Sequence, residues 1–472
     1  MKREGGGGSG RETETARSAA TAPAALRPVP GSRGLPLVSA VWHTLKLQFV
    51  DGWKRHFEAL RRRHRSNVFR VAAFGRAVAV TDATAFAVFS DWDGRLEKEY
   101  GFGPAVAPPR PLVGPTTPGI FSRGFGHSDP KALHVALLRL RAGRLEPALD
   151  RAIDAAFARW EAESRVALRD GIEILVEDFL HDWLIGSAPE RPVLRPLYPG
   201  IFGHRLRWLT RHFPSSAYAR AEATRARQMA VLKAAPGFRE IAALPEAAPL
   251  GGEDAVAGQV AFLMGVNCFL GLQNLFKSVL GELAANPDEA AALRAEVEAA
   301  SSEAGGPLGL AATAALPRLD RFLKETLRLH PPVFFVYGTA TRDFALEASD
   351  GRYRVERGER VVGVIPMVQR DPARYDRPDA FDPARFEDPA AEAGLVWPHG
   401  FMHDPAEDPH AHVCPGRDVA LSIAKRFCAR LVADADWALT ATPRWSEGRF
   451  ELNVAAPEGH LRVARFARRG GD

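Results

Sequence analysis

The chain has 472 residues, 46% of them hydrophobic, so it can bury a large core as one enzyme-sized domain or as about two to three smaller ones. Its net charge is +5, and its densest basic run is residues 60–65 (LRRRHR). This run lacks the interleaved aromatic side chains of a nucleic-acid-binding protein. We therefore interpret it as a solvated helix face that also favours anionic surfaces. The three cysteines are odd in number and scattered, so the sequence suggests neither a disulfide framework nor a structural zinc site, and a reducing compartment fits best.

Residues 1–36 are rich in Gly, Ser, Ala and Pro and poor in large apolar side chains, so they cannot offset the entropy of becoming ordered. We predict a disordered N-terminal leader over residues 1–36 and one large domain over residues 37–472, because no internal repeat or low-complexity linker interrupts the remainder. No apolar run approaches the roughly 18 to 20 residues of a bilayer span, so a soluble, cytoplasmic protein is expected. The Arg, Ser and Ala content of the leader leaves organelle targeting open, and peripheral contact with a membrane also stays open.

Helical patterns dominate the domain. Apolar residues recur at helical spacing over residues 133–162, and Asp129 is the expected N-cap of that helix, with Pro130 at its first position. Residues 255–287 are apolar nearly all round, which predicts a long helix buried through the middle of the protein. Further helices are expected over residues 288–300, 317–330 and 418–436.

Alternating polar and apolar residues surround an Asp350-Gly351 turn in residues 345–364, which predicts a β-hairpin. The fold class that follows is mainly α with small β-sheets, organised as a single large domain around a long buried central helix.

Three short motifs carry the chemistry. Glu325 and Arg328 are three apart on one helix face and could pair, although such pairs are more often found on solvated helices. Arg385 follows in a proline-punctuated, irregular segment. Cys414 precedes Pro415, Gly416 and a helix, and there the nearby N–H groups and helix dipole should lower the pKa of its thiol and suit it to hold a metal.

These motifs, in this order and spacing, resemble the cytochrome P450 superfamily and its fold. The resemblance implies that residues 37–472 form a haem-thiolate catalytic domain that binds haem b through Cys414 as the axial ligand of the iron. It also implies that Glu325, Arg328 and Arg385 form a buried charge-paired triad behind the cysteine loop, and that His412 faces a haem propionate.

Oxygen-activating members of that superfamily usually carry an acidic residue followed by Thr in the central helix. Residues 262–276 (FLMGVNCFLGLQNLF) contain neither, so this proton relay cannot be built from them. The segment instead resembles the Phe-Asn-x-x-Gly-Gly pattern of the allene oxide synthase and hydroperoxide lyase group, with Leu270 in place of the first glycine.

Other stretches resemble the same group: residues 31–36, 95–102, 129–139, 331–359 and 397–418. The ligand loop departs from the Asn-Lys-Gln-Cys-Ala-Gly-Lys-Asp of the plant members, so the chain looks like a distant member.

The resemblance implies an enzyme that rearranges polyunsaturated fatty-acid hydroperoxides by homolytic O–O cleavage, without O2, NADPH or a redox partner. Asn267 matches the asparagine that orients the hydroperoxide, although a helix-packing amide is the alternative. Phe102 matches the aromatic ring that favours allene oxide formation over chain cleavage, although an ordinary core ring is equally compatible. Val333, Phe334 and Phe335 are expected to line an apolar pocket for the acyl chain.

Allene oxide synthase is therefore the expected activity. Alternatives in the same group are a hydroperoxide lyase and an epoxyalcohol synthase. Outside that group, the alternatives are a conventional monooxygenase served by a redoxin, a haem protein without turnover, and a peroxide-dependent fatty-acid hydroxylase. The absent acid-threonine pair argues against the monooxygenase, and the absence of an arginine in the central helix argues against the hydroxylase.

Overall fold

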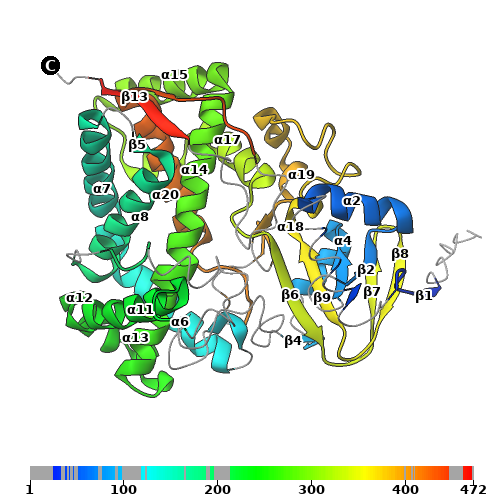
Figure 1. Cartoon of the computed structure of the whole chain (residues 1–472). Coiled ribbons are helices and arrows are strands. Elements are labelled where there is room, and N and C mark those ends of the chain that lie inside the picture. The colour runs from blue at the N-terminus through cyan, green and yellow to red at the C-terminus, as the bar shows by residue number, and fades with distance from the viewer. Residues whose placement is uncertain are drawn as a thin grey trace, which may run out of the picture.

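The computed structural model describes residues 25–32, 38–39, 42, 46, 52–72, 77–90, 94–97, 119–122, 125–163, 166–187, 192–195, 213–397, 400–404, 408, 410–445 and 461–469. Figure 1 shows a larger helical part beside a smaller part that contains a five-stranded sheet. The helical part contains α6 (Phe125–Leu140), α7 (Ala142–Ala162), α8 (Leu168–Ile185), α11 (Ala217–Ala234), α12 (Pro236–Ala242), α13 (Glu253–Phe262), α14 (Phe269–Ala285), α15 (Pro287–Ala304), α16 (Leu310–Ala314), α17 (Pro317–Leu329) and α20 (Arg417–Asp434). Short helical turns connect these elements: η3 (Gly119–Phe121), η4 (Pro245–Leu250), η6 (Pro383–Glu387), α18 (Ile365–Val368) and α19 (Pro389–Glu392).

The five-stranded sheet has the order β2 (Val68–Val71), β3 (Ala77–Val80), β9 (Arg360–Val364), β6 (Phe335–Ala340) and β4 (Leu96–Glu97). It packs against α2 (Gly52–His64) and the short helices α4 (Ala83–Phe86) and η2 (Ala87–Phe89). A second sheet has the order β1 (Leu26–Pro28), β8 (Gly351–Val355) and β7 (Phe344–Ala348). The remaining sheets are β12 (Ala435–Leu439), β13 (Arg462–Arg468) and β5 (Val166–Ala167), and the pair β10 (Val396–Trp397) and β11 (Gly400–Phe401).

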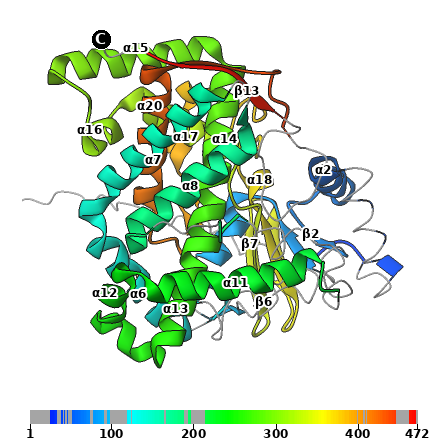
Figure 2. The same ribbon diagram turned by 60° about the vertical axis from the view of Figure 1, so that its left-hand side comes forward.

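The long central helix is confirmed, and it runs from Glu253 to Ala285 through α13, a π-helical segment (η5, Leu263–Cys268) and α14. Figures 1 and 2 show α8 and α20 alongside α14. The helix is long and apolar enough to cross a bilayer, so our expectation that no such run exists is wrong; however, 72% of its most apolar window is buried inside the protein. A buried core helix passes the same test of length and composition, so this helix is weak evidence for a membrane span.

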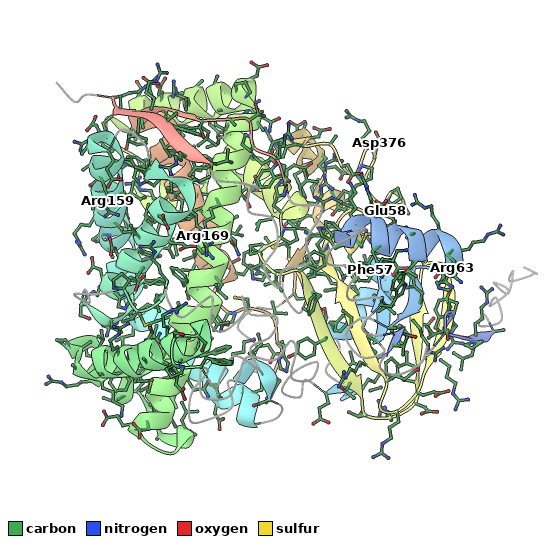
Figure 3. All side chains as sticks on the ribbon, viewed as in Figure 1. Phe57, Glu58, Arg63, Arg159, Arg169 and Asp376 are labelled. Atoms are coloured by element: carbon green, nitrogen blue, oxygen red, sulfur yellow. The ribbon has the colours of Figure 1, made fainter. Side chains whose placement is uncertain are left out.

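Several predicted elements are confirmed. Helices α15, α17 and α20 match the predicted segments, and β7 and β8 form the hairpin, with Ala348 opposite Gly351. The solvated face of the basic run is also confirmed, because Arg62, Arg63 and Arg65 are exposed. Figure 3 labels Arg63 on the outer side of α2 and Phe57 beneath that helix, where Phe57 is buried against the sheet.

The predicted helix start at Asp129 is wrong, because α6 begins at Phe125 and encloses Pro130. Tertiary contacts hold the additional turn: the His127 ring bonds Gly119 O at 3.0 Å and Ala411 O at 3.2 Å. The single helix expected over residues 133–162 is divided at Arg141, whose buried guanidinium bonds the carbonyls of Leu184 and Gly237.

The predicted leader is partly ordered. Leu26–Pro28 forms β1 and pairs in parallel with Arg352–Arg354 of β8, so the assignment of disorder to all of residues 1–36 is wrong for this strand. A sheet edge far along the chain supplies the partner for these residues, and their composition does not reveal it. Residues 1–24 lie outside the described residues.

A buried acid–histidine pair connects the central helix to the end of α17. His330 Nε2 lies 2.5 Å from Glu282 Oε1, both side chains are 4% exposed, and the Trp445 ring stacks on His330 at 3.5 Å. Burial raises the pKa of Glu282 to about 8 and lowers the pKa of His330 well below its ordinary 6.5. The pair is therefore neutral near pH 7, with the proton on the carboxyl group.

This pair should make the protein less stable at pH 8 than at pH 6.5. A carboxyl group whose folded pKa is raised stabilises the fold at low pH, and this contribution is lost as the pH rises toward 8. The opposite contribution of His330 is already complete above pH 6.5, its unfolded value. We expect Tm to fall over this interval and Glu282→Gln to reduce the fall. An equal fall in Tm in the variant would contradict the assignment.

Candidate active site

Cys414 lies in the loop directly before α20 and lines a cavity in the helical part. Burial raises the pKa of its thiol, while the N–H groups of Trp397 and Gly416 and the charges of Lys131 and Arg417 act in the opposite direction. The predicted lowering of this pKa is therefore wrong for the free thiol, because desolvation outweighs the helix end. A bound metal cation reverses this balance, because a coordinating thiol is deprotonated.

The central helix contributes several residues to the wall of the cavity. Asn267, Cys268 and Gly271 line the same space as Cys414, and Asn267 is exposed although most of its helix is buried. Asn267 and Cys268 belong to the π-helical segment, a distortion that is frequent at functional sites. Burial raises the pKa of Cys268 to about 12, so its thiol stays neutral. The structure therefore brings the predicted ligand and the predicted catalytic amide to one cavity.

The rest of the cavity wall is apolar. Among the described residues that line it there is no Asp, Glu, Ser, Thr, Lys or Arg, and its remaining polar side chains are His134, Trp183 and Trp397. Val333 lines the cavity as predicted. Phe334 and Phe335 do not, because both are buried in the cluster between α2 and the sheet. Phe102 lies outside the described residues.

Side chains of helix α6 form hydrogen bonds with the segment that precedes Cys414. Lys131 Nζ lies 2.5 Å from Asp408 O and 2.5 Å from Ala411 O, and burial lowers the pKa of Lys131 to about 8. The His127 ring bonds Ala411 O and stacks on His412 at 3.5 Å. His412 is buried in this stack, which places its ring between α6 and the cysteine loop. Its predicted role toward a propionate stays a prediction.

His134, one turn along α6 from Lys131, is the clearest sign that the cavity accepts a polar group. Its ring is buried, its Nε2 atom has no hydrogen-bond partner among the described residues, and the ring lines the cavity. Burial lowers the pKa of His134 to about 4, so the ring is neutral near pH 7. Because buried polar atoms are nearly always paired, an unpartnered nitrogen at a cavity wall fits a bound group with polar substituents.

The predicted triad forms a buried cluster of charges. Arg328 bonds Glu325 through two guanidinium nitrogens, at 2.7 and 2.8 Å, and Arg385 Nε bonds Glu325 Oε1 at 3.0 Å. Glu325 and Arg328 are 0% exposed, so the alternative of a solvated surface pair is wrong. Three backbone carbonyls accept the other Arg328 N–H groups, namely those of Gln369, Pro378 and Ala380. Every charged group of the triad is therefore hydrogen-bonded, as burial requires.

Three polar residues of the site were not identified from the sequence: Lys131, His134 and Trp397. Lys131 and His134 are three apart in the helix, so their spacing alone places them on one face. That face could not be oriented without the contact between α6 and the cysteine loop. Trp397 precedes Cys414 by 17 residues, and no spacing rule connects the two positions.

Comparison with known proteins agrees with this geometry. Residues 275–444, which contain the triad and Cys414, match the family model of cytochrome P450. Over this region the chain is similar to the cytochromes P450. The similarity to individual relatives is distant, since a divinyl ether synthase of Selaginella moellendorffii is 25% identical over 86% of the chain and 90% of that protein. Allene oxide synthase 1 of Oryza sativa is 28% identical over 86% of the chain and 85% of that protein. With a divinyl ether synthase of Nicotiana tabacum the identity is 36%, but the match spans 37% of each chain.

Solved structures show the same fold. A retinoic acid-bound cyanobacterial cytochrome P450 superposes with a TM-score of 0.70 at 20% identity, covering 94% of this chain and all of that one. Ligand-free cytochrome P450 OleT gives 0.71 at 16% identity, covering 94% and 99%. The fold class predicted from the sequence is thus confirmed, and haem b is the cofactor that the matched family implies.

The residues of the cavity fit that cofactor. Cys414 would supply the sulfur ligand that a haem iron takes in this family. His134 offers an unpartnered nitrogen for a polar substituent, and the apolar side chains around them match the porphyrin face.

Proposed function

We propose that this protein is a cytochrome P450 enzyme that rearranges polyunsaturated fatty-acid hydroperoxides without O2, NADPH or a redox partner. The observation that carries the proposal is the wall of the cavity, which contains a neutral amide, Asn267, together with Cys414, and no acid or hydroxyl side chain among its described residues. Activation of O2 needs delivered protons, whereas a hydroperoxide already contains the O–O bond that is to be cleaved.

The bound haem supplies the iron at which the O–O bond is cleaved. Asn267 supplies donors and an acceptor for the hydroperoxide oxygens without adding charge. Apolar residues such as Val333, Leu272 and Ile365 keep the surrounding space dry and suit an acyl chain. Conversion of a hydroperoxide into an allene oxide removes one molecule of water and needs no external oxidant or reductant, so the atoms and electrons balance.

Allene oxide is the product that we propose, because Phe102 matches the aromatic position of allene oxide synthases. A divinyl ether is the second candidate, since several of the relatives bear that name. A hydroperoxide lyase or an epoxyalcohol synthase would use the same cavity. These enzymes would differ in what happens to the substrate radical that remains after homolytic cleavage of the O–O bond.

The direct test supplies purified ferric enzyme with a linoleate hydroperoxide under anaerobic conditions and without NADPH. We expect rapid loss of the conjugated-diene absorbance, and no loss with Cys414→Ala, which lacks the sulfur ligand. Product analysis then separates ketols derived from allene oxide, divinyl ethers, aldehydes and epoxyalcohols. An enzyme that leaves the hydroperoxide intact and oxygenates another substrate with NADPH would overturn the proposal.

A further inference from the structure

A second cavity lies at the surface beside α2. It has a volume of about 540 Å³, within the range of small-molecule sites, and it shares no described lining residue with the cavity of Cys414. Four segments form its wall: α2, on which Figure 3 labels Glu58, the turn after α2, the hairpin turn between β7 and β8, and α18 with the chain that follows it. The lining residues are Lys54, Glu58, Arg61, Arg62, Arg65, Ser66, Asn67, Asp350, Met367, Arg370, Pro372, Pro378 and Asp379.

Positive charge dominates this wall, because five cationic side chains line it together with three carboxylates. Lys54 and Arg370 share one of these carboxylates, that of Asp379, at 2.7 and 3.3 Å. Arg61 pairs with Asp371 at 3.1 Å. The side chains of Lys54 and Arg370 are only 14% and 13% exposed. These pairs therefore hold the cations in place at the wall before any ligand binds.

Two further arginines lie where the cavity meets solvent. Arg62 and Arg65 are exposed, and neither forms an ion pair with another residue in the part of the chain that the structure describes. Arg65 also has a φ of +48°, in the left-handed region that glycine usually occupies at the end of a helix. Arginine is strained there, and such strain is concentrated at functional sites. A ligand bound by its side chain would account for an arginine at this position.

The side chains of the wall indicate the chemistry of that ligand. Arginine binds phosphate well, because its planar guanidinium can donate two parallel hydrogen bonds to the phosphate oxygens. Glu58 lies four residues before Arg62 on the same face of α2 and lines the same cavity. Its carboxylate repels a bare anion but accepts hydrogen bonds from hydroxyl groups. The wall therefore favours a phosphate ester with hydroxyl groups over inorganic phosphate.

We propose that this cavity binds a phosphate ester that carries hydroxyl groups, such as a sugar phosphate, through Arg62 and Arg65. A free ester and the head group of an inositol phospholipid offer the same chemistry, so the experiment has one arm for each. The site is separate from the cavity of Cys414, and the inference does not depend on which substrate the enzyme converts.

The first arm titrates the purified holoenzyme with ribose 5-phosphate in a calorimeter. Arg65→Gly removes the guanidinium and also relieves the left-handed strain, so Tm should not fall. The affinity should fall by about tenfold or more, the effect of losing one charge-assisted hydrogen bond. Arg62→Gln, at an exposed position of α2, should weaken binding in the same way. Inorganic phosphate should bind more weakly than the sugar phosphate.

Arg63→Gln is the matched control. It removes the same charge from an exposed position of the same helix, but Arg63 does not line the cavity, so the affinity should stay close to the wild-type value. Equal weakening of binding in Arg63→Gln and Arg65→Gly would overturn the proposal, because diffuse surface charge would then explain the binding.

The second arm measures co-sedimentation of the holoenzyme with phosphatidylcholine vesicles that contain a phosphatidylinositol phosphate. Binding in either arm that Arg65→Gly weakens and Arg63→Gln does not weaken supports a phosphate-ester site. Calorimetric binding without co-sedimentation assigns the site to a free ester, and co-sedimentation without calorimetric binding assigns it to a lipid head group. Binding of neither probe would overturn the proposal.

Discussion

Replacement of Glu325 by glutamine should lower the free energy of unfolding by about 3–5 kcal/mol, because it leaves Arg328 buried without a counter-charge. Glu325 accepts from Arg328, from Arg385 and from the backbone N–H of Asp382, and glutamine keeps the shape while removing the charge. Since a typical fold has about 5–15 kcal/mol of stability, this is a large fraction of the total. Denaturant unfolding of the holoenzyme and the fraction of protein that retains thiolate-ligated haem both report the loss.

Glu347→Gln is the matched control for this substitution. Glu347 pairs with Arg352 at 2.8 Å in the β7–β8 hairpin, but its side chain is 57% exposed. Solvent screens exposed pairs, so the change there should stay within about 1 kcal/mol. Equal shifts of the denaturation midpoint in Glu325→Gln and Glu347→Gln would contradict this prediction. They would mean that burial does not raise the cost of removing one charge of the triad.

Replacement of Asn267 by alanine should reduce turnover of a fatty-acid hydroperoxide by about 100-fold, the magnitude typical of losing one donor to developing charge. The amide lines the same cavity as the cysteine, and alanine removes its donors and acceptor. The spectrum of the reduced carbon monoxide complex should keep its thiolate signature, because Cys414 is untouched. Stopped-flow measurement of diene loss gives the rate.

Two further variants separate catalysis from packing. Asn274→Ala removes an amide from the same helix at a buried position that does not line the cavity, so it should leave the turnover rate near that of the wild type. Asn267→Gln retains the carboxamide and should recover part of the lost rate. Unchanged turnover in Asn267→Ala would remove this residue from the mechanism and assign its amide to helix packing.

The local sequence was sufficient to predict those features in which a residue acts with its near neighbours in the chain. Glu325 and Arg328 share a helix turn, so their spacing already indicated a possible pair, and Cys414 lies shortly before Gly416, the N-cap of α20. The hairpin at residues 344–355 followed from its turn and its alternation, because both strands are contiguous in the chain. Strands β2 and β3 were not predicted, although Val68–Val71 and Ala77–Val80 are rich in β-branched residues and alanine.

Contacts between distant segments determined the rest. The start of α6, its break from α7 and the ordering of β1 all depend on partners more than forty residues away in the sequence. The pKa of Cys414 was predicted to fall and instead rises, because burial is a property of the packed molecule. Lys131, His134 and Trp397 became part of the site for the same reason.

By itself, the sequence determined the spacing of Glu325 and Arg328, the central helix and the absence of an acid-threonine pair, because each depends on residue type and short-range spacing. The prediction of Cys414 as ligand and of Arg385 as the third member of the triad came from the resemblance to a family. Only the tertiary structure decided that Asn267 and Cys414 face one apolar cavity and that His134 and Trp397 present buried nitrogens to it. The physical reason is that hydrogen-bond satisfaction and desolvation depend on the atoms that surround a group in space, and these come from α6, α14, β10 and α20 together.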